Sequence, residues 1–559
     1  MEHQDWKLPT LNSYIDKWAA EAPQRTALVQ HEDDKSYSYE EFKQTVDFFA
    51  LKLLEKGVGF GDRVATMLPM AAEHVFLMYA CFKVGAIIAP LDLRLQAHEV
   101  VRDLSKIEPK AFFFPGQTPQ RDFREVGERV KQECPSVELL VQLSPDPSTE
   151  DIIEGAVSVA EIKQPPEISP EKLTEAYNQV DTRTPAIIIF TTGTTGEPKP
   201  ALICHENIII QTRILGLGID VESKDMSMLV NLPPSHVGGV TEQLMTTLFM
   251  GGTAVLLRVF DARLSLQAVE KRRLTVLGQI PTQFRMEWAL PDYKDFDLSS
   301  LQFAIYGGSA VDKEFLENLS KMAPYFGTGM GMTETAGMYT FTPKGISVDE
   351  MAGQVGAPFD DLAPVTIREP MQPDGSAGGA LPQGEVGEIC VEGPIVFLGY
   401  HQQPEETAKN LSKDGVLYTG DIGHLKDMGS YRALYLEGRQ KFIIKQKGYQ
   451  VFPYEVEEYI ASHPQVEQAE VVGMPHQIFD EGIFAFVKLK EGADIAAEDI
   501  IEYCKGIASY KRPQHVEIWP RETEFPLTRI TKIDKMQLKE EAKPIIEKLR
   551  NEGKWDAGN

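Results

Sequence analysis

Cysteine, basic residues and long hydrophobic runs are all scarce in this chain. Its 559 residues include five cysteines, which lie far apart and form no C-x-x-C pair. Neither a disulfide framework nor a cysteine-based zinc site is predicted, and this cysteine usage favours a reducing, cytoplasmic compartment. The most apolar stretch, residues 75–91, is interrupted by Lys83, Gly85 and Pro90. A buried helix followed by a strand therefore fits this stretch better than a membrane span.

The scarcity of basic residues gives the chain a strong negative charge. Lys and Arg together number 56 against 83 Asp and Glu, a net charge of −27. Such a surface repels phosphate backbones, so nucleic acid is not an expected partner. Residues 1–5 show neither the basic nor the apolar part of a secretory signal, and none is expected. With 42% hydrophobic and 25% charged residues, the composition is that of a globular protein long enough for several domains.

Strand-like and helical patterns alternate through the first four hundred residues. An early example is a strand at 62–68, a helix at 71–84 and a strand at 86–91. This alternation predicts an α/β fold with a mostly parallel sheet flanked by helices. Residues 186–190 are uninterruptedly apolar, as in a strand that is buried on both faces.

Changes in composition indicate the larger divisions of the chain. Residues 143–182 are rich in Pro, Glu and Ser and are interpreted as an acidic connecting segment, whereas the Gly- and Pro-rich stretch 364–400 predicts a small β-barrel or β subdomain. Beyond residue 436 the patterns predict a compact α+β unit, with helices at 456–462 and 497–508 and strands at 466–473 and 483–489. The expected fold is thus a large α/β part, a small β subdomain and a small α+β C-terminal domain.

The most informative motif directly follows the apolar strand at 186–190. It reads Thr-Thr-Gly-Thr-Thr-Gly-Glu-Pro-Lys over residues 191–199. Its glycines allow a tight turn in which backbone N–H groups point inward around an anion, and its hydroxyls and Lys199 add donors and positive charge. The motif lacks the G-K-[S/T] of a Walker loop. A phosphate-binding loop is the favoured interpretation, and a Thr/Gly-rich surface loop is the alternative.

This nonapeptide resembles the signature of AMP-forming acyl-CoA synthetases, members of the adenylate-forming superfamily that also contains luciferases and the adenylation domains of peptide synthetases. Further motifs follow in the family's order to the end of the chain. The resemblance implies a carboxylate–CoA ligase that uses ATP, Mg²⁺ and coenzyme A, forming an acyl-adenylate and then a thioester. It also implies a cytoplasmic monomer or homodimer. The phosphate-binding residues would be Thr191, Thr192, Gly193, Thr194, Thr195, Gly196 and Lys199.

Two Gly-rich motifs resemble the family's adenine and α-phosphate segments. Residues 329–334 are similar to G-Y-G-x-T-E, in which the Thr contacts the α-phosphate and the Glu holds magnesium. The resemblance gives these roles to Thr333 and Glu334, and a carboxylate suits a hard cation. Residues 306–310 are similar to the S-G-G-A-P loop beside adenine. By this resemblance Gly308, Ser309, Met330 and Gly331 would contact the nucleotide, although Met330 replaces the family's Tyr.

Later motifs resemble the ribose site, the hinge and the catalytic lysine of the family. Asp421 and Arg439 correspond to the ribose-binding pair, and Lys441 to the hinge residue. Lys445 and Gly448 would face the thiol in the second half-reaction, and Lys532 would be the catalytic lysine, with Lys535 as the nearby alternative because Thr531 replaces a family Gly. The implied division is an N-terminal domain at 1–437, a hinge at 438–441 and a mobile C-terminal domain at 442–559.

The acyl-binding residues are the least specific part of the resemblance. His236 stands where the family has a residue that gates the acyl tunnel, and the absence of Asp from 231–239 disfavours an α-amino-acid substrate. The small residues Gly238, Gly239, Ala336 and Gly337 predict a pocket with room for an apolar acyl, alicyclic or aryl group. The candidate substrate-binding residues are His236, Gly239, Gly307, Met332, Ala336 and Gly337. Acyl transfer to a carrier protein and a catalytically weak nucleotide-binding relative are the alternative functions.

Overall fold

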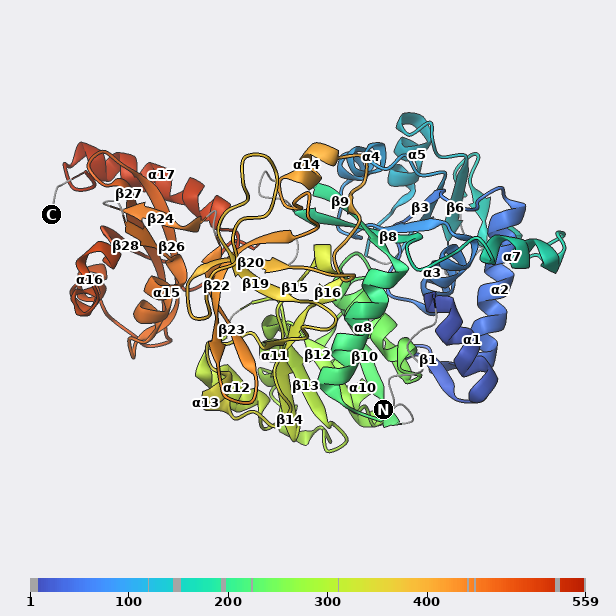
Figure 1. Cartoon of the computed structure of the whole chain (residues 1–559), viewed down its shortest axis with the longest axis horizontal. Helices are drawn as coiled ribbons and strands as arrows, with labels where there is room; N and C mark the ends of the chain where they lie inside the picture. The colour runs from blue at the N-terminus through green and yellow to red at the C-terminus, as the bar shows by residue number, and fades with distance from the viewer. Residues whose placement is uncertain are drawn as a thin grey trace.

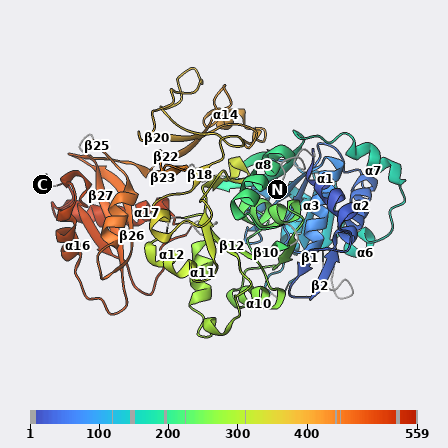
Figure 2. The ribbon, with the colours of Figure 1, turned by 60° about the horizontal axis from the view of Figure 1, so that its bottom comes forward.

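A computed structural model describes residues 9–118, 120–143, 152–192, 198–222, 225–309, 311–439, 442–446, 449–527 and 533–556. Within these ranges, every helix is too short or too polar to cross a membrane. The elements of the last hundred residues occupy one end of the longest axis, and the N-terminal helices occupy the other (Figures 1 and 2).

Two large sheets form the body of the molecule. The first has the order β14 (Tyr325–Thr328), β13 (Phe303–Tyr306), β12 (Val276–Gln279), β10 (Ser227–Val230), β11 (Thr253–Leu256), β1 (Thr26–Gln30), β2 (Lys35–Ser38). The second has the order β21 (Gly399–Tyr400), β9 (Pro198–Cys204), β8 (Pro185–Thr192), β4 (Ile87–Pro90), β3 (Arg63–Thr66), β5 (Ala111–Pro115), β6 (Leu139–Leu143), β7 (Val157–Ser158). Most neighbouring pairs are parallel, as the sequence predicted; β1/β2, β8/β9 and β9/β21 are antiparallel.

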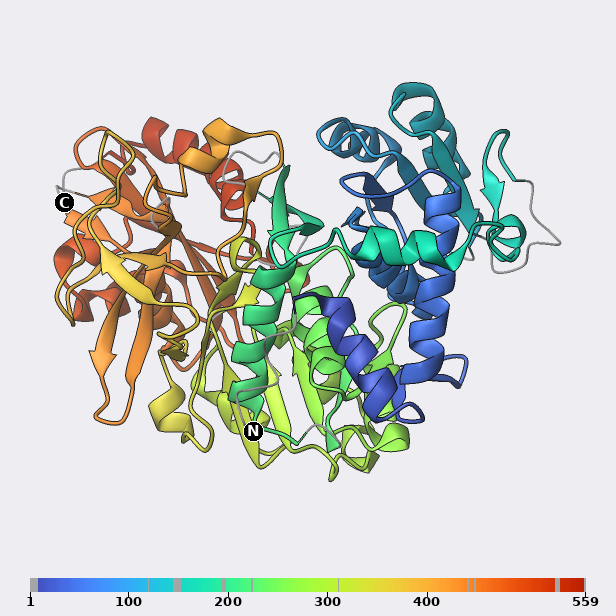
Figure 3. The same cartoon turned by 45° about the vertical axis from the view of Figure 1, so that its right-hand side comes forward.

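Helices cover both faces of each sheet. Alternate residues of one strand enter different cores: Val64 of β3 joins the central core, and Ala65 joins the core under the outer helices. The central layer contains α1 (Leu11–Glu21), α2 (Tyr39–Glu55), α3 (Ala72–Val84), α8 (His205–Ile219), the π-helix η3 (Gly238–Met245) and α9 (Thr246–Phe249). Outside the second sheet lie α4 (Ala97–Ser105) and α5 (Arg124–Glu133), and outside the first lie α10 (Ala262–Arg272), α11 (Pro281–Trp288) and α12 (Lys313–Leu319). Figure 3 shows α1 and α2 (blue) next to each other in the central layer.

Local sequence explains several of these elements. Ser38 and Glu41 form a reciprocal capping box at the start of α2. Helix α3 is buried almost all round because it lies in the central layer, and Gly85 ends it with a φ of 71°. The stretch 75–91 is therefore a buried helix followed by β4, as predicted. Strand β8 contributes Ile187 and Ile189 to one core and Ile188 to another, which confirms burial on both faces.

The small β subdomain is a four-stranded antiparallel sheet. Its order is β19 (Val365–Arg368), β20 (Gly387–Val391), β22 (Leu417–Asp427), β23 (Arg432–Arg439). Two short pairs connect it to the first sheet: β15 (Gly331–Met332) with β16 (Gly337–Met338), and β17 (Thr340–Phe341) with β18 (Ala357–Pro358). In the sequence, the short helix α13 (Val348–Met351) lies between β17 and β18, and α14 (Pro404–Ala408) lies between β21 and β22.

The C-terminal elements form a separate α+β unit. Its sheet has the order β25 (Tyr449–Val451), β24 (Ile444–Gln446), β27 (Asp480–Leu489), β26 (Val466–His476), with β28 (His515–Ile518) also paired to β27. Cores on its two faces involve α15 (Pro453–Ala461) and α16 (Ala497–Tyr503) on one side and α17 (Lys535–Asn551) on the other. The predicted α/β fold with a separate C-terminal domain is confirmed.

One expectation about the fold is wrong in part. Residues 143–182 are not only a connecting segment, because they contain β7, α6 (Val159–Ile162) and α7 (Pro170–Tyr177). Ser169 caps α7, Pro170 occupies its first turn, and Leu173 and Ala176 pack into the central core. The Pro that suggested a linker is thus the first residue of a helix, a position where its missing N–H costs nothing.

Candidate functional site

The two predicted adenine and α-phosphate motifs follow neighbouring strands. β12, β13 and β14 are parallel, so their carboxyl ends lie at one edge of the first sheet. Residues 307–309 follow β13, and residues 330–334 follow β14 through a short loop. Thr328 Oγ1 donates a hydrogen bond to the Tyr306 carbonyl at 2.8 Å, which joins the two strand ends. Gly308 has a φ of 92°, a conformation that glycine adopts without strain.

Glu334 lies in a short 3₁₀ turn and is only 6% exposed. The Tyr400 hydroxyl donates to its Oε1 at 2.6 Å, and Asn410 Nδ2 donates to the same hydroxyl oxygen at 3.2 Å. Burial and the neighbouring Glu334 carboxylate raise the pKa of Tyr400, so the phenol remains a donor. Tyr400 was not identified from the sequence, because nothing in the residues around it indicates a contact with Glu334.

The donor set around Glu334 suits magnesium that arrives with phosphates. Among the residues that the structure describes, no three His, Cys, Asp or Glu side chains are arranged to enclose a metal ion. Magnesium in nucleotide sites is commonly held by one or two carboxylates together with substrate phosphates. A single buried carboxylate fits that requirement, whereas it would be a poor site for a permanently bound metal.

The predicted phosphate-binding residues lie at the β8/β9 hairpin. Thr191 pairs with Lys199 across the two strands; residues 193–196 lie outside the described residues, and so does the side chain of Thr192. Lys199 Nζ is 2.7 Å from Glu406 Oε2 and 5.3 Å from the ring centroid of Tyr400. Hydrogen bonds from Lys199 and Lys409 lower the pKa of Glu406 to about 2, so this carboxylate is charged at neutral pH.

Glu334 and Lys199, which come from two separate motifs, therefore both contact the side chain of Tyr400. Tyr400 binds the carboxylate through its hydroxyl and has the lysine ammonium over its ring. Strand β21, which carries Tyr400, pairs with β9, which carries Lys199. Glu406, like Tyr400, was not predicted from the sequence. Pro404 indicates the start of helix α14, but no residue near Glu406 in the sequence indicates that it pairs with Lys199.

The predicted ribose pair lies on adjacent strands. Asp421 of β22 is directly opposite Arg439 of β23, and Asp421 is 5% exposed. The Arg439 side chain lies outside the described residues. A second carboxyl is close by: Glu388 accepts from the Gly420 N–H at 3.0 Å, and burial together with the Asp421 charge raises the pKa of Glu388.

Two of the candidate acyl residues, His236 and Gly239, lie at the start of the π-helix η3; Gly307 follows β13, and Met332 of β15 pairs with Gly337 of β16. His236 Nδ1 accepts from the Gly238 N–H at 3.0 Å, which ties the imidazole to the first turn. A Cβ at Gly239 would lie 2.5 Å from the Pro233 carbonyl oxygen, so backbone packing requires this glycine. This contact, and not room for a ligand, explains the small residue at 239.

Ala336 and Gly337 adopt positive φ angles of 55° and 131°. Thr241 Oγ1 donates to the Ala336 carbonyl at 2.5 Å, and a Cβ at Gly337 would meet Glu242 and Gln211. Gln211 is fully buried, and within the described part of the chain neither its amide nitrogen nor its amide oxygen has a hydrogen-bond partner. The surroundings of Ala336 and Gly337 are thus more polar than the small residues alone suggested.

In the C-terminal unit, Lys445 is exposed on β24 and its backbone N–H donates to Glu481 Oε2 at 2.8 Å. Lys441, Gly448 and Lys532 lie outside the described residues. Lys535, the alternative to Lys532, is buried at the start of α17 and paired with Glu457 and Glu470. Lys535 therefore has two carboxylate partners within its own domain.

Stacked α/β sheets with a carboxylate and a lysine gathered at the strand ends define a nucleotide-binding α/β enzyme with a separate C-terminal domain. The chain belongs to the AMP-binding enzyme family, whose model matches residues 15–401, and the model of the AMP-binding enzyme C-terminal domain matches residues 455–532. The class predicted from the sequence, an AMP-forming acyl-CoA synthetase, is confirmed.

Relatives and solved structures agree with this membership. The chain is 30% identical to the mitochondrial medium-chain acyl-CoA ligase ACSF2 of Danio rerio over 541 residues, 93% of this chain and 86% of the relative. It is 27% identical to the putative acyl-CoA synthetase YngI of Bacillus subtilis, covering 95% and 96% of the two chains. The crystal structure of ATP-bound MatB from Rhodopseudomonas palustris superposes with a TM-score of 0.78 at 25% identity, covering 96% of this chain and 99% of that one.

Proposed function

We propose that this acyl-CoA synthetase binds MgATP at the strand ends around Glu334, Tyr400 and Lys199 and activates a monocarboxylic acid there. The observation that carries the proposal is the convergence of Glu334 and Lys199 on Tyr400, since a triphosphate with its cation needs a carboxylate and a lysine close together. Thr191, the first residue of the predicted phosphate-binding loop, pairs with Lys199 across β8 and β9, which supports the same location.

The first half-reaction joins the acid to AMP. The substrate carboxylate attacks the α-phosphorus of ATP, and pyrophosphate leaves. Residues 191–199 hold the leaving pyrophosphate, Thr333 donates to the α-phosphate, and Lys532 stabilises the charge that moves between the carboxylate and the phosphate. Magnesium bound with the triphosphate supplies further positive charge, and Glu334 would hold it. Positioning and electrostatic stabilisation provide most of the catalysis.

The remaining residues orient the other parts of the substrates. Asp421 and Arg439 hold the ribose. The adenine side is formed by Gly308, Ser309, Met330 and Gly331, and the acid side by His236, Gly239, Gly307, Met332, Ala336 and Gly337.

The second half-reaction transfers the acyl group to CoA. The CoA sulfur attacks the acyl carbon and AMP leaves. We assign residues 1–437 to the N-terminal domain and 442–559 to a mobile C-terminal domain that turns about residues 438–441, with Lys441 as the pivot. Lys532 faces the site during adenylation, and the surface of Lys445 and Gly448 faces it during thioester formation. We expect a cytoplasmic monomer or homodimer.

The acid is proposed to be a medium-chain aliphatic one, because ACSF2 relatives are named medium-chain acyl-CoA ligases. The test is pyrophosphate release from MgATP across short, medium, branched, alicyclic and aromatic acids, with and without CoA. Release that depends on the acid, with acyl-CoA formed when CoA is added, is the expected result. Acid-dependent release without acyl-CoA would point to a carrier protein as acceptor, and no release with any acid would contradict the proposed activity.

A further inference from the structure

The ammonium of Lys199 already has a carboxylate partner. Lys199 Nζ lies 2.7 Å from Glu406 Oε2; the lysine side chain is 11% exposed and the glutamate side chain 29%. A lysine proposed to bind phosphate oxygens is therefore neutralised before a nucleotide arrives. We propose that Glu406 competes with the polyphosphate for Lys199 and thereby weakens the binding of pyrophosphate, which the first half-reaction must release. This inference rests on the proposed phosphate-binding role of Lys199.

The position of Glu406 relative to Lys199 is determined by backbone contacts. Helix α14 closely follows β21, and the Tyr400 N–H donates to Thr407 Oγ1 in this helix at 2.9 Å. The His401 N–H donates to the Pro200 carbonyl at 2.7 Å, next to Lys199 on β9. The helix is thus attached to the strand that carries the lysine, so the pair does not depend on a long mobile side chain alone.

The charges of the cluster allow such competition. Glu406 also pairs with Lys409, an exposed residue of the same segment, so its charge is shared between two cations. Phosphate oxygens that approach Lys199 meet the like charge of Glu406 at close range, and this repulsion is strong where solvent screening is reduced. Removing the Glu406 charge leaves Lys199 available for phosphate, whereas removing Lys409 leaves Glu406 more strongly attracted to Lys199.

The test measures binding of magnesium pyrophosphate to the full-length protein by titration calorimetry. Glu406→Gln is expected to bind pyrophosphate about tenfold more tightly than the wild type, and Lys409→Gln two- to threefold more weakly. Glu405→Gln is the matched control, because it removes an equal charge from an exposed neighbour in the same helical turn. It is expected to change the affinity less than twofold.

A double-mutant cycle assigns the effect to the pair. In a Lys199→Met background only the direct repulsion between Glu406 and the phosphates remains, so Glu406→Gln is expected to strengthen pyrophosphate binding less than threefold. Unchanged or weaker binding by Glu406→Gln alone, or equal strengthening with and without Lys199, would overturn the inference. If Lys199→Met by itself leaves pyrophosphate affinity unaltered, the phosphate-binding role of Lys199 in the proposed function fails, which is a different result from a failed competition.

Discussion

Two lysines with little exposed side chain, one at each end of the molecule, are each paired with two carboxylates. Lys83 of α3 lies 2.5 Å from Asp47 of α2 and 3.4 Å from Asp16 of α1. Lys535 at the start of α17 pairs with Glu457 and lies 3.2 Å from Glu470. Each lysine is thus held by two carboxylates from other elements.

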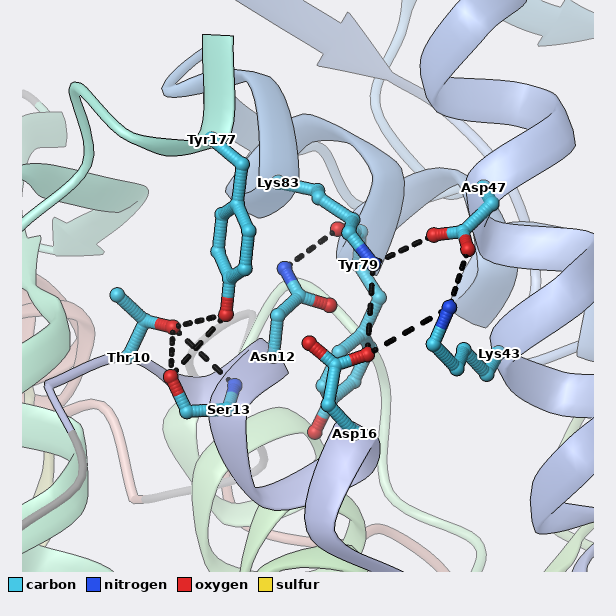
Figure 4. Close-up of polar contacts among 9 residues, drawn as sticks. All are labelled: Thr10, Asn12, Ser13, Asp16, Lys43, Asp47, Tyr79, Lys83 and Tyr177. Atoms are coloured by element: carbon cyan, nitrogen blue, oxygen red, sulfur yellow. Dashed lines mark hydrogen bonds and ion pairs between the residues drawn. The ribbon is translucent and has the colours of Figure 1, made fainter. Parts of the chain in front are cut away.

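The surroundings of Lys83 connect helices of the central layer. Figure 4 shows Lys83 between Asp16 and Asp47, with Lys43 beside both carboxylates. Nearby, Asn12 Nδ2 donates to the Tyr79 carbonyl at 3.0 Å, and Tyr177 of α7 joins the start of α1 through Thr10 and Ser13 (Figure 4). All of these contacts lie among α1, its N-cap residue Thr10, α2, α3 and α7.

The surroundings of Lys535 adjoin the segment that carries the proposed catalytic lysine. Leu527 and Ile533 form a bridge on either side of residues 528–532, and the Asp534 N–H donates to the Pro526 carbonyl at 2.8 Å. Burial opposes the charge on Lys535, but Glu457 and Glu470 raise its pKa, so the ammonium stays charged. Similar ion clusters therefore occur in different places in the fold: one joins helices of the central layer, and the other lies at the start of α17, shortly after the residue proposed as the catalytic lysine.

The largest expected effect comes from Lys532, which precedes Lys535 in the sequence. Lys532→Ala is expected to lower the adenylation rate by about 10²–10³, because one charge donor at a transition state contributes about 3–4 kcal/mol. Thioester formation from a prepared acyl-adenylate should remain largely intact. Carboxylate-dependent ATP–pyrophosphate exchange measures the first step. Equal losses in both half-reactions would contradict the assignment of Lys532.

Lys83→Met tests the ion cluster in the central helix layer, for which we expect a structural role only. It removes the more buried of the two cations beside Asp16 and Asp47 and leaves Lys43, so we expect the free energy of unfolding to fall by about 2 kcal/mol. Both half-reactions of the protein that remains folded should keep their rates. Urea unfolding and the two activity assays check this; a selective loss of adenylation would show that Lys83 also influences the site.

Glu287 extends the comparison to a buried carboxyl group that is hydrogen-bonded to an amide and not paired with a lysine. Glu287 of α11 is fully buried, accepts from Gln279 Nε2 at 2.9 Å, and burial raises its pKa to about 8. Between pH 6 and 8 the unfolded chain has lost this proton and the folded protein retains it, so the stability falls as the pH rises. We expect this residue to account for a decrease of about 2 kcal/mol over that range.

Glu287→Gln should remove this decrease, because the amide is isosteric and does not titrate. Urea unfolding of both proteins at pH 6 and pH 8 provides the measurement. Parallel changes in the two proteins would mean that Glu287 is ionised in the folded state.

Lys535→Met should lower the adenylation activity, whereas Lys83→Met should not, and this difference would distinguish the two ion clusters. We expect adenylation by the folded variant to fall about tenfold, roughly 1.4 kcal/mol, because the start of α17, which follows Lys532 in the sequence, loses its ion pairs with Glu457 and Glu470. Thioester formation from acyl-adenylate should change less than twofold. The readout is the ratio of the two half-reaction rates in folded protein, with Lys83→Met as the control. An unchanged ratio of the two rates would mean that the cluster at Lys535, like the one at Lys83, has a structural role only.

Much of the fold was predictable from local patterns. The strand, helix and strand expected at 62–91 correspond to β3, α3 and β4, and the β subdomain expected at 364–400 contains β19 and β20. Residues 143–182 were misjudged because Pro and Glu are common both in linkers and in the first turn of a helix. Only the burial of Leu173 and Ala176 against the central layer distinguishes the two.

The sequence by itself determined the α/β class, the order of motifs and the family, because strand periodicity and Gly-rich turns are encoded by residues close together in the chain. Tertiary structure alone decided that Tyr400 joins Glu334 to Lys199, that Glu406 neutralises Lys199, and that Gly239 packs against a carbonyl. Most of these contacts link segments that are far apart in the chain, and all of them exist only after the sheets and helices have packed. A short-range pattern therefore carries no signal for them.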